Sequence, residues 1–148
     1  MPIVQTRVVI DAPLETVWKV VSDPRNLPRW DRHVIAVRGV PDSGLEVGAE
    51  YSTELRLMGV HGKVRARVLE LRPPELSRIR VSGLLDAVVE TKLSPLDGDR
   101  TRLDQRVDFR FVGGPFGVFA AGAVRRLGAQ RILDRGVLAQ KAQAEAAR

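Results

Sequence analysis

Hydrophobic and polar side chains alternate along much of this 148-residue chain. The clearest case is the segment 50–58, in which Tyr51, Thr53 and Leu55 alternate with charged or small polar neighbours. Successive side chains of a β-strand point to opposite faces of a sheet, so this period of two predicts a strand with one apolar and one polar face. Together with turn residues such as Asp97-Gly98-Asp99, the same pattern predicts strands over residues 34–40, 50–58, 61–71, 76–83, 87–93 and 103–111.

The apolar faces of these strands need a partner, and the C-terminal segment can supply one. Gly113-Gly114 breaks the last strand, and Pro115 suits the first turn of a helix. A hydrophobic stripe at helical spacing follows, formed by Phe116, Phe119, Ala120, Ala123, Val124 and Leu127. We expect one helix from Gly114 to about Ala139, packed on the sheet, and an alanine-rich polar tail over 140–148 that frays. This predicts an α+β fold whose antiparallel sheet has one solvated face.

The first thirty residues follow a different pattern. A β-rich run stops at Asp11, which can cap a helix, and Pro13 fits the first turn. Asp23-Pro24 ends this helix, because the residue before a proline is disfavoured in the α conformation. A second short helix carries Leu27 and Trp30. The first helix is indicated by hydrophobic residues on one face, namely Leu14, Val17, Trp18 and Val21.

The run Ile-x-Ala-Pro-x-x-x-Val-Trp over residues 10–18, followed by Trp30, resembles the START-like superfamily (SRPBCC; polyketide cyclase/dehydrase and lipid transport). The resemblance implies a helix-grip fold, in which a curved antiparallel sheet of about seven strands surrounds a long C-terminal helix. It also implies two short helices after the first strand and an internal apolar cavity. We expect a single START-like domain over residues 1–148, with Trp18 in the core and Trp30 either in the core or at the cavity mouth.

The chain is 44% hydrophobic, has a net charge of +6 and contains no cysteine. A basic protein can bind nucleic acid through the phosphates, but these basic residues are scattered among acidic ones, as in Arg102, Asp104, Arg106, Asp108 and Arg110. We interpret this alternation as a solvated strand face with cross-strand ion pairs, and expect no specific nucleic-acid partner. No apolar run approaches the roughly 20 residues of a membrane-spanning helix, and no secretory signal is evident. These features predict a cytoplasmic location with unknown partner proteins.

The sequence contains no nucleophile elbow, Walker loop or dinucleotide fingerprint. No pair of carboxylates falls on the predicted inward face, which argues against acid/base chemistry of the glycosidase kind. His33 and His61 are far apart, and we interpret them as unrelated surface or turn residues, with a metal or catalytic pair as the alternative. We therefore expect no cofactor, no bound metal and no catalytic residue.

The side chains on the inward face of the predicted sheet are mostly apolar, with a few neutral polar groups among them. This composition is typical of small-molecule sites. Small inward residues such as Gly62 and Ala66 indicate space between sheet and helix. We expect a non-catalytic protein that binds or transports a hydrophobic small molecule: a lipid, a polyketide-like or an aromatic compound. The alternatives are an aromatase/cyclase or dehydratase for polyketide-like substrates, which the resemblance implies, and an accessory role with a protein partner or in a quinone pathway. The predicted ligand-binding residues are Trp30, Tyr51, Thr53, Leu55, Val64, Ala66, Val81, Val89, Thr91, Gln105, Val107, Phe109, Phe116, Phe119, Ala123 and Leu127.

Overall fold

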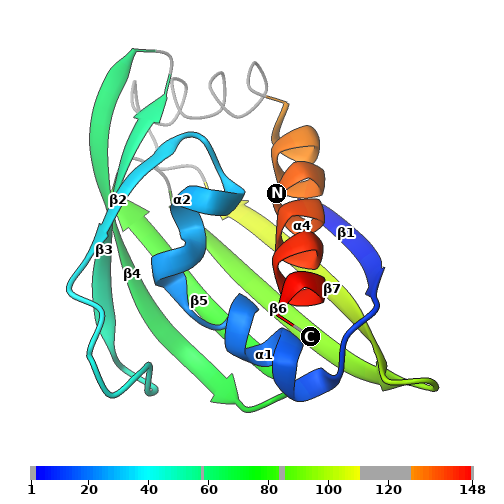
Figure 1. Cartoon of the computed structure of the whole chain (residues 1–148). Coiled ribbons are helices and arrows are strands. Elements are labelled where there is room, and N and C mark those ends of the chain that lie inside the picture. The colour runs from blue at the N-terminus through cyan, green and yellow to red at the C-terminus, as the bar shows by residue number, and fades with distance from the viewer. Residues whose placement is uncertain (1–2, 58, 84–85, 111–127, 148) are drawn as a thin grey trace.

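The computed structural model describes residues 3–57, 59–83, 86–110 and 128–147, which form an antiparallel seven-stranded sheet with helices on one side (Figure 1). The strands are β1 (Ile3–Ile10), β2 (Val34–Arg38), β3 (Glu50–Leu57), β4 (Val60–Arg72), β5 (Leu76–Gly83), β6 (Asp86–Leu96) and β7 (Arg100–Arg110). The helices are α1 (Leu14–Val21), a short 3-10 helix (Pro24–Asn26), α2 (Leu27–Trp30) and α4 (Ala129–Ala146).

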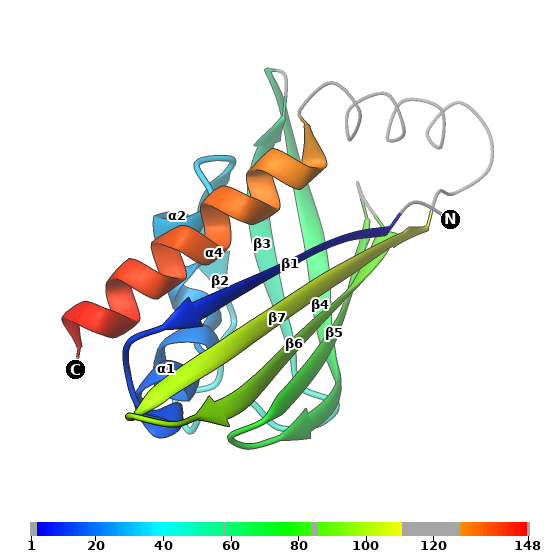
Figure 2. The same ribbon diagram turned by 90° about the vertical axis from the view of Figure 1, so that its right-hand side faces the viewer.

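The strand order is β1-β7-β6-β5-β4-β3-β2, so consecutive strands from β2 to β7 are paired and β1 pairs with β7 at one edge. The sheet is curved, and α4 lies on its concave side (Figure 2). The helices α1 and α2 lie after the first strand and contact α4. This arrangement confirms the predicted helix-grip fold.

The two faces of the sheet differ as the alternation predicts. Tyr51 on β3 lies opposite Ala66 on β4, and both side chains are buried on the concave face. On the convex face, Arg78 of β5 donates to Glu90 of β6 at 2.7 Å. Both side chains are partly exposed, so this ion pair contributes little to stability but keeps the face polar. Within the stretch 102–110, for which the sequence predicts cross-strand ion pairs, Asp104 of β7 forms one with Arg7 of β1.

The pairing of β6 with β7 continues closer to their connecting turn than the alternation predicts. Their last pair is Leu96 with Arg100, directly at the connecting turn. Gly98 and Asp99 both have positive φ, +74° and +54°. This backbone suits a tight hairpin turn whose twist matches that of the strands, so pairing continues to the turn itself. The alternation alone could not show how short the turn is.

The segment before α1 differs from the prediction in one respect. The helix begins after Pro13, which is its N-cap residue and has extended backbone angles, and Asp11 does not cap it. The backbone N–H of Asp11 instead donates to the Glu145 carboxylate at 2.8 Å. The predicted end of α1 before Pro24 is confirmed, with Ser22 as the C-cap residue.

The C-terminal helix differs from the prediction at both ends. It is preceded by Gly128, whose φ of +64° is left-handed, so a single uninterrupted helix from 114 to 139 is wrong. The stripe of Phe116, Phe119, Ala123 and Leu127 and the glycine-rich segment before it lie outside the described residues.

The tail that the sequence predicts to fray is helical through Ala146. Ala144 is completely buried, and Lys141 donates to the backbone carbonyl of Val9 at 2.9 Å. Ala144 is therefore a small residue that allows the helix to approach the rest of the protein. Its end is held by packing and by hydrogen bonds to β1 and to the turn after β1.

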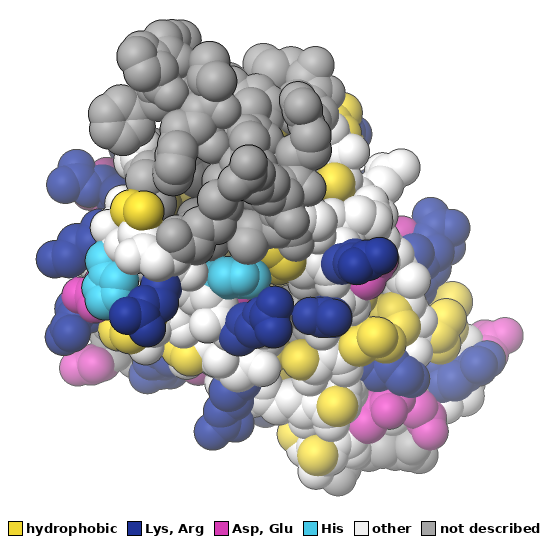
Figure 3. Space-filling model, turned by 90° about the horizontal axis from the view of Figure 1, so that it is seen from above, with side chains coloured by type: hydrophobic (Ala, Val, Ile, Leu, Met, Phe, Trp, Pro, Cys, Tyr) yellow, Lys and Arg dark blue, Asp and Glu magenta, His cyan; other side chains and the backbone are white. Residues whose placement is uncertain are grey.

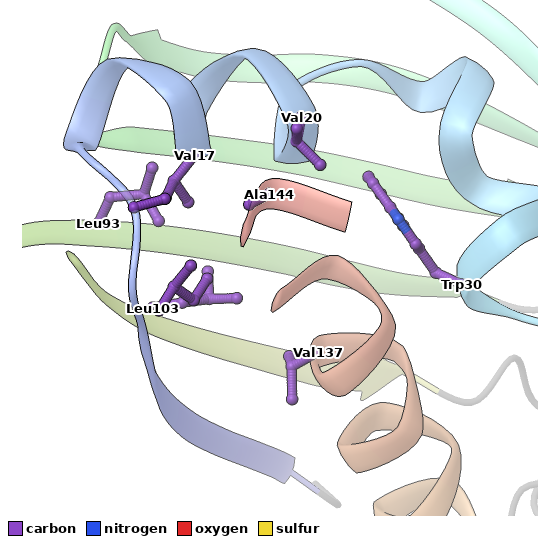
Figure 4. Packing of buried hydrophobic residues seen from close by; sticks show 9 residues of the cluster. Val17, Val20, Trp30, Leu93, Leu103, Val137 and Ala144 are labelled. Carbon is purple, nitrogen blue, oxygen red and sulfur yellow. The ribbon is translucent and has the colours of Figure 1, made fainter. Parts of the chain in front are cut away.

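The hydrophobic core lies at the end of the sheet where α1 covers it (Figure 4). Val17 and Val20 from α1 meet Leu93 of β6 and Leu103 of β7. The same cluster includes residues from the other helices, namely Trp30 of α2 and Val137 and Ala144 of α4. Trp18 packs against this cluster and is partly buried, as expected for a core residue. The C-terminal half of α4 thus belongs to the core.

A charge at Ala144 tests this docking. Ala144→Asp would bury an unpaired carboxylate in a filled site, and we expect a loss of about 3 kcal/mol or more in the free energy of unfolding. Ala142→Asp is the matched control, because Ala142 is exposed on the same helix. Thermal and urea unfolding followed by circular dichroism measure both. Equal stability of the two variants would contradict the docking of the helix end.

Candidate ligand-binding cavity

A cavity of about 320 Å³ lies between the concave face of the sheet, α2 and α4. All seven strands contribute to its wall, and α4 contributes Ile132, Leu133, Gly136 and Gln140. The cavity lies beside the core, because the helices α1 and α2 fill only one end of the concave face with Val17, Val20 and Trp30.

Twelve of the predicted ligand-binding residues lie on the cavity wall. They are Trp30, Tyr51, Thr53, Leu55, Val64, Ala66, Val81, Val89, Thr91, Gln105, Val107 and Phe109. The other four, Phe116, Phe119, Ala123 and Leu127, lie outside the described residues. The alternation brings the strand residues together, because positions two apart share a face and the antiparallel register aligns neighbouring strands. That these residues contact a ligand stays a prediction.

Tyr51 places a polar group in this apolar wall. Its side chain is only 6% exposed, and burial raises the pKa of its hydroxyl well above the ordinary value. The phenol therefore stays protonated throughout the physiological pH range. Among the described residues its hydroxyl has no hydrogen-bond partner, so it can donate to a molecule in the cavity.

Thr91 and Gln105 form a second polar group on the wall. They face each other across β6 and β7 in register, and the Gln105 amide donates to the Thr91 hydroxyl at 3.1 Å. The bond satisfies part of the polar capacity of two buried or half-buried side chains. It leaves the Gln105 carbonyl oxygen and the Thr91 hydroxyl hydrogen for further partners.

His33 is a cavity-wall residue that the sequence analysis did not include among the ligand-binding residues. It lies in the turn before β2, as expected, but its side chain is only 13% exposed and lies on the cavity wall. The ring Nδ1 is 2.7 Å from the Asp31 carboxylate, which also accepts from the backbone N–H of His33 at 2.8 Å. The sequence signal that could have indicated this position is the Asp-x-His spacing immediately after Trp30. The other histidine, His61, is exposed on β4.

Trp30 connects the cavity wall to α4. Its indole N–H donates to the side-chain oxygen of Gln143 at 2.9 Å, and the Gln143 amide donates to Asn26 at 3.1 Å. Asn26 in turn donates to the backbone carbonyl of Val20 at 3.0 Å. This chain of hydrogen bonds links α1, the 3-10 helix, α2 and α4. Trp30 is therefore a core residue that also lies on the cavity wall, and its contact with a ligand stays a prediction.

Gln140 is a wall residue that the sequence analysis assigned to the fraying tail. Its side chain is only 4% exposed, and its Oε1 is buried without a hydrogen-bond partner. No pattern in the sequence marked it, because a glutamine in a polar, alanine-rich segment is typical of an exposed helix. Its position depends on the docking of the helix end.

On the face shown in Figure 3, basic side chains do not form one continuous patch; they lie at separate places with acidic groups among them.

Among the described residues, no group of three or more histidine, cysteine or acidic side chains is arranged to hold a metal ion. Within the same part of the chain, no helix has the length and apolar character to cross a membrane.

Comparison with known families assigns the chain to one of them. The family model described as polyketide cyclase/dehydrase and lipid transport matches residues 1–145. The chain therefore belongs to this family, as the resemblance of residues 10–30 indicates. A comparison with curated proteins found no match.

Solved structures with the same fold have low sequence identity. A protein of Thermus thermophilus is 18% identical with a TM-score of 0.77, covering 99% of both chains. The Zhui aromatase/cyclase from a Streptomyces species is 20% identical with a TM-score of 0.77, covering 97% of this chain and 93% of the other. A START superfamily protein from Mycobacterium smegmatis is 18% identical with a TM-score of 0.71, covering 99% of both chains. These similarities establish the fold.

The burial of Tyr51 can be measured directly, because it is the only tyrosine in the chain. In the folded protein, the absorbance of the phenolate should appear only well above pH 10, because burial raises the pKa of Tyr51. In denaturant, the pKa should return to the ordinary tyrosine value of about 10. Since the folded state favours the protonated phenol, the free energy of unfolding should fall as the pH rises above about 10. Tyr51→Phe removes the absorbance change and serves as the control. A folded-state midpoint near 10 would contradict a buried phenol.

Proposed function

We propose that this protein binds a hydrophobic small molecule in the cavity between the sheet and α4. The observation that carries the proposal is the cavity itself, about 320 Å³ in volume and lined mainly by aliphatic and aromatic side chains. Small-molecule sites typically have volumes from about 300 to 1,000 Å³, with apolar walls and a few placed polar groups. The family match and the aromatase/cyclase among the structural neighbours support a lipid, polyketide-like or aromatic ligand.

The physical basis of binding is the burial of apolar surface. Val64, Val89 and Val107 present branched side chains to the cavity from three different strands. A ring or alkyl chain that displaces water from such a wall gains about 25 cal/mol for each Å² of apolar surface removed from water. The polar groups at Tyr51 and at the Thr91–Gln105 pair then orient the ligand. Binding of this kind requires no covalent chemistry, which favours a carrier or sensor.

A second candidate function, cyclisation or dehydration of a polyketide-like substrate, is favoured by the Asp31–His33 pair on the cavity wall. An imidazole oriented by a carboxylate is a suitable general base for removing a proton next to a carbonyl. An enolate formed in this way can attack a second carbonyl of the same chain, with water leaving in a later step. Conversion of a linear poly-β-ketone into a ring would distinguish this candidate from a carrier, which returns its ligand unchanged.

Filling the cavity from the sheet side tests binding. Ala66 is buried and lies on the wall, so Ala66→Leu adds volume where there is space. We expect a stability change within about 1 kcal/mol and at least a roughly tenfold weaker affinity for the apolar fluorophore N-phenyl-1-naphthylamine, equivalent to about 1.4 kcal/mol.

Ala87→Leu is the matched control, since Ala87 is equally buried on β6 but is not among the described wall residues. There the added volume should cost about 1–3 kcal/mol of stability, because the site is already packed. Fluorescence titration and urea unfolding measure both variants. Unchanged probe affinity in a folded Ala66→Leu protein, or no probe binding to the unmodified protein, would contradict the proposed function.

A further inference from the structure

The side-chain amide of Gln140 is a buried and incompletely satisfied polar group on the cavity wall. Gln140 is 96% buried, with only 4% of its surface exposed, and its Oε1 has no hydrogen-bond partner. Buried carbonyl oxygens are almost always paired, since leaving one unpaired lowers stability. The position of Gln140 on α4 directs this amide to the cavity rather than to solvent. A bound molecule that donates a hydrogen bond would complete the site.

His33 offers a second unfilled position on the same wall. A carboxylate can only accept hydrogen bonds, so Nδ1 carries the hydrogen that is donated to Asp31. In the neutral ring, Nε2 is then an acceptor, and it has no partner among the described residues. The backbone of His33 is also held, because its carbonyl accepts from the Arg56 N–H at 2.8 Å. The imidazole is thus positioned before any ligand arrives.

These two groups come from elements that are in contact. A Cβ placed on Gly136 of α4 would lie 3.8 Å from the backbone carbonyl oxygen of Trp30, the residue before Asp31. Gln140 follows Gly136 by about one helical turn, and both lie on the cavity wall together with Asp31 and His33. The wall formed by α4 and by the connection between α2 and β2 therefore carries unfilled acceptors of its own. Across from it, the sheet wall is mostly apolar, with polar groups at Tyr51 and at the Thr91–Gln105 pair.

The charge of the wall restricts the ligand further. The described wall residues include no lysine or arginine, and the carboxylate of Asp31 lies among them. A ligand carboxylate or phosphate would find no cation there and would be placed near a negative group. A hydroxyl group, in contrast, can donate its hydrogen to one of these unfilled acceptors. Because it is uncharged, it is not repelled by the carboxylate of Asp31.

Resting on the proposed function, we propose that the cavity takes an uncharged ring compound bearing a hydroxyl group, and that this hydroxyl donates its hydrogen to the amide oxygen of Gln140. Ring compounds of this chemistry bury their apolar part against the sheet and place the hydroxyl at α4. The unpaired amide oxygen of Gln140 lowers the stability of the free protein and is satisfied only when the ligand is bound.

Three probes of similar size separate the polar contribution from the apolar one: 9-phenanthrol, 9-methylphenanthrene and phenanthrene-9-carboxylate. With the unmodified protein at neutral pH, we expect the hydroxyl probe to bind about tenfold more tightly than the methyl probe, the effect of satisfying one buried acceptor. The carboxylate should bind most weakly of the three. Fluorescence titration and isothermal calorimetry measure the dissociation constants.

Gln140→Leu removes the acceptor while keeping an apolar side chain of similar size. We expect the preference for the hydroxyl probe to fall below about threefold, with little change for the methyl probe. The melting temperature should stay the same or rise, because the variant removes an unpaired buried group. Gln130→Leu is the matched control, an exposed glutamine on the same helix, and it should keep the preference in full.

Several outcomes would overturn this proposal. They are equal binding of the hydroxyl and methyl probes, tightest binding of the carboxylate, or a full hydroxyl preference in Gln140→Leu. A large drop in melting temperature for Gln140→Leu would show that the amide is bonded within the free protein, and would also overturn it. Binding of none of the three probes would instead contradict the proposed function itself.

Discussion

The docking of the C-terminal half of α4 is the constraint on which the rest of this structure depends. Ala144 and Val137 enter the core formed by α1, β6 and β7, and Gln143 accepts the indole N–H of Trp30. These contacts hold one end of the helix at one end of the concave sheet. The preceding turns of α4 then extend over the remaining concave face, where Ile132 and Leu133 form part of the cavity wall. Core and cavity are thus two parts of one helix–sheet interface.

The chemical character of the cavity follows from the alternation of the strands. The positions that face outward carry ion pairs such as Arg78 with Glu90, and the inward positions are aliphatic, small or neutral polar. Among the described wall residues, ionisable groups are therefore confined to a few places: Tyr51, whose pKa is raised by burial, and the Asp31–His33 pair. Such a wall favours recognition by shape and by a few hydrogen bonds, which is why hydrophobic ligand binding is preferred here over chemistry that needs several charged groups.

Most of the fold and twelve residues of the cavity wall, all on strands or α2, could be predicted from the sequence. A period of two assigns the face of each strand residue, and the antiparallel register collects these faces. The errors arose where a residue acts through a distant contact. Asp11 bonds to Glu145, 134 positions away, and Ala144 of the tail is buried only because that helix end docks. The burial of Gln140 likewise depends on tertiary neighbours, which no local pattern reveals.

The central claim, that an apolar molecule occupies the space between sheet and helix, is tested most directly by intermolecular nuclear Overhauser effects from a bound aromatic probe to valine methyl groups. Val64 and Val107 lie on the cavity wall, whereas Val9 is exposed on β1 and serves as the outer reference. The account predicts effects to the methyl groups of Val64 and Val107 and none to Val9. Effects confined to Val9, or an absence of effects to the wall methyl groups when the probe is bound, would contradict it.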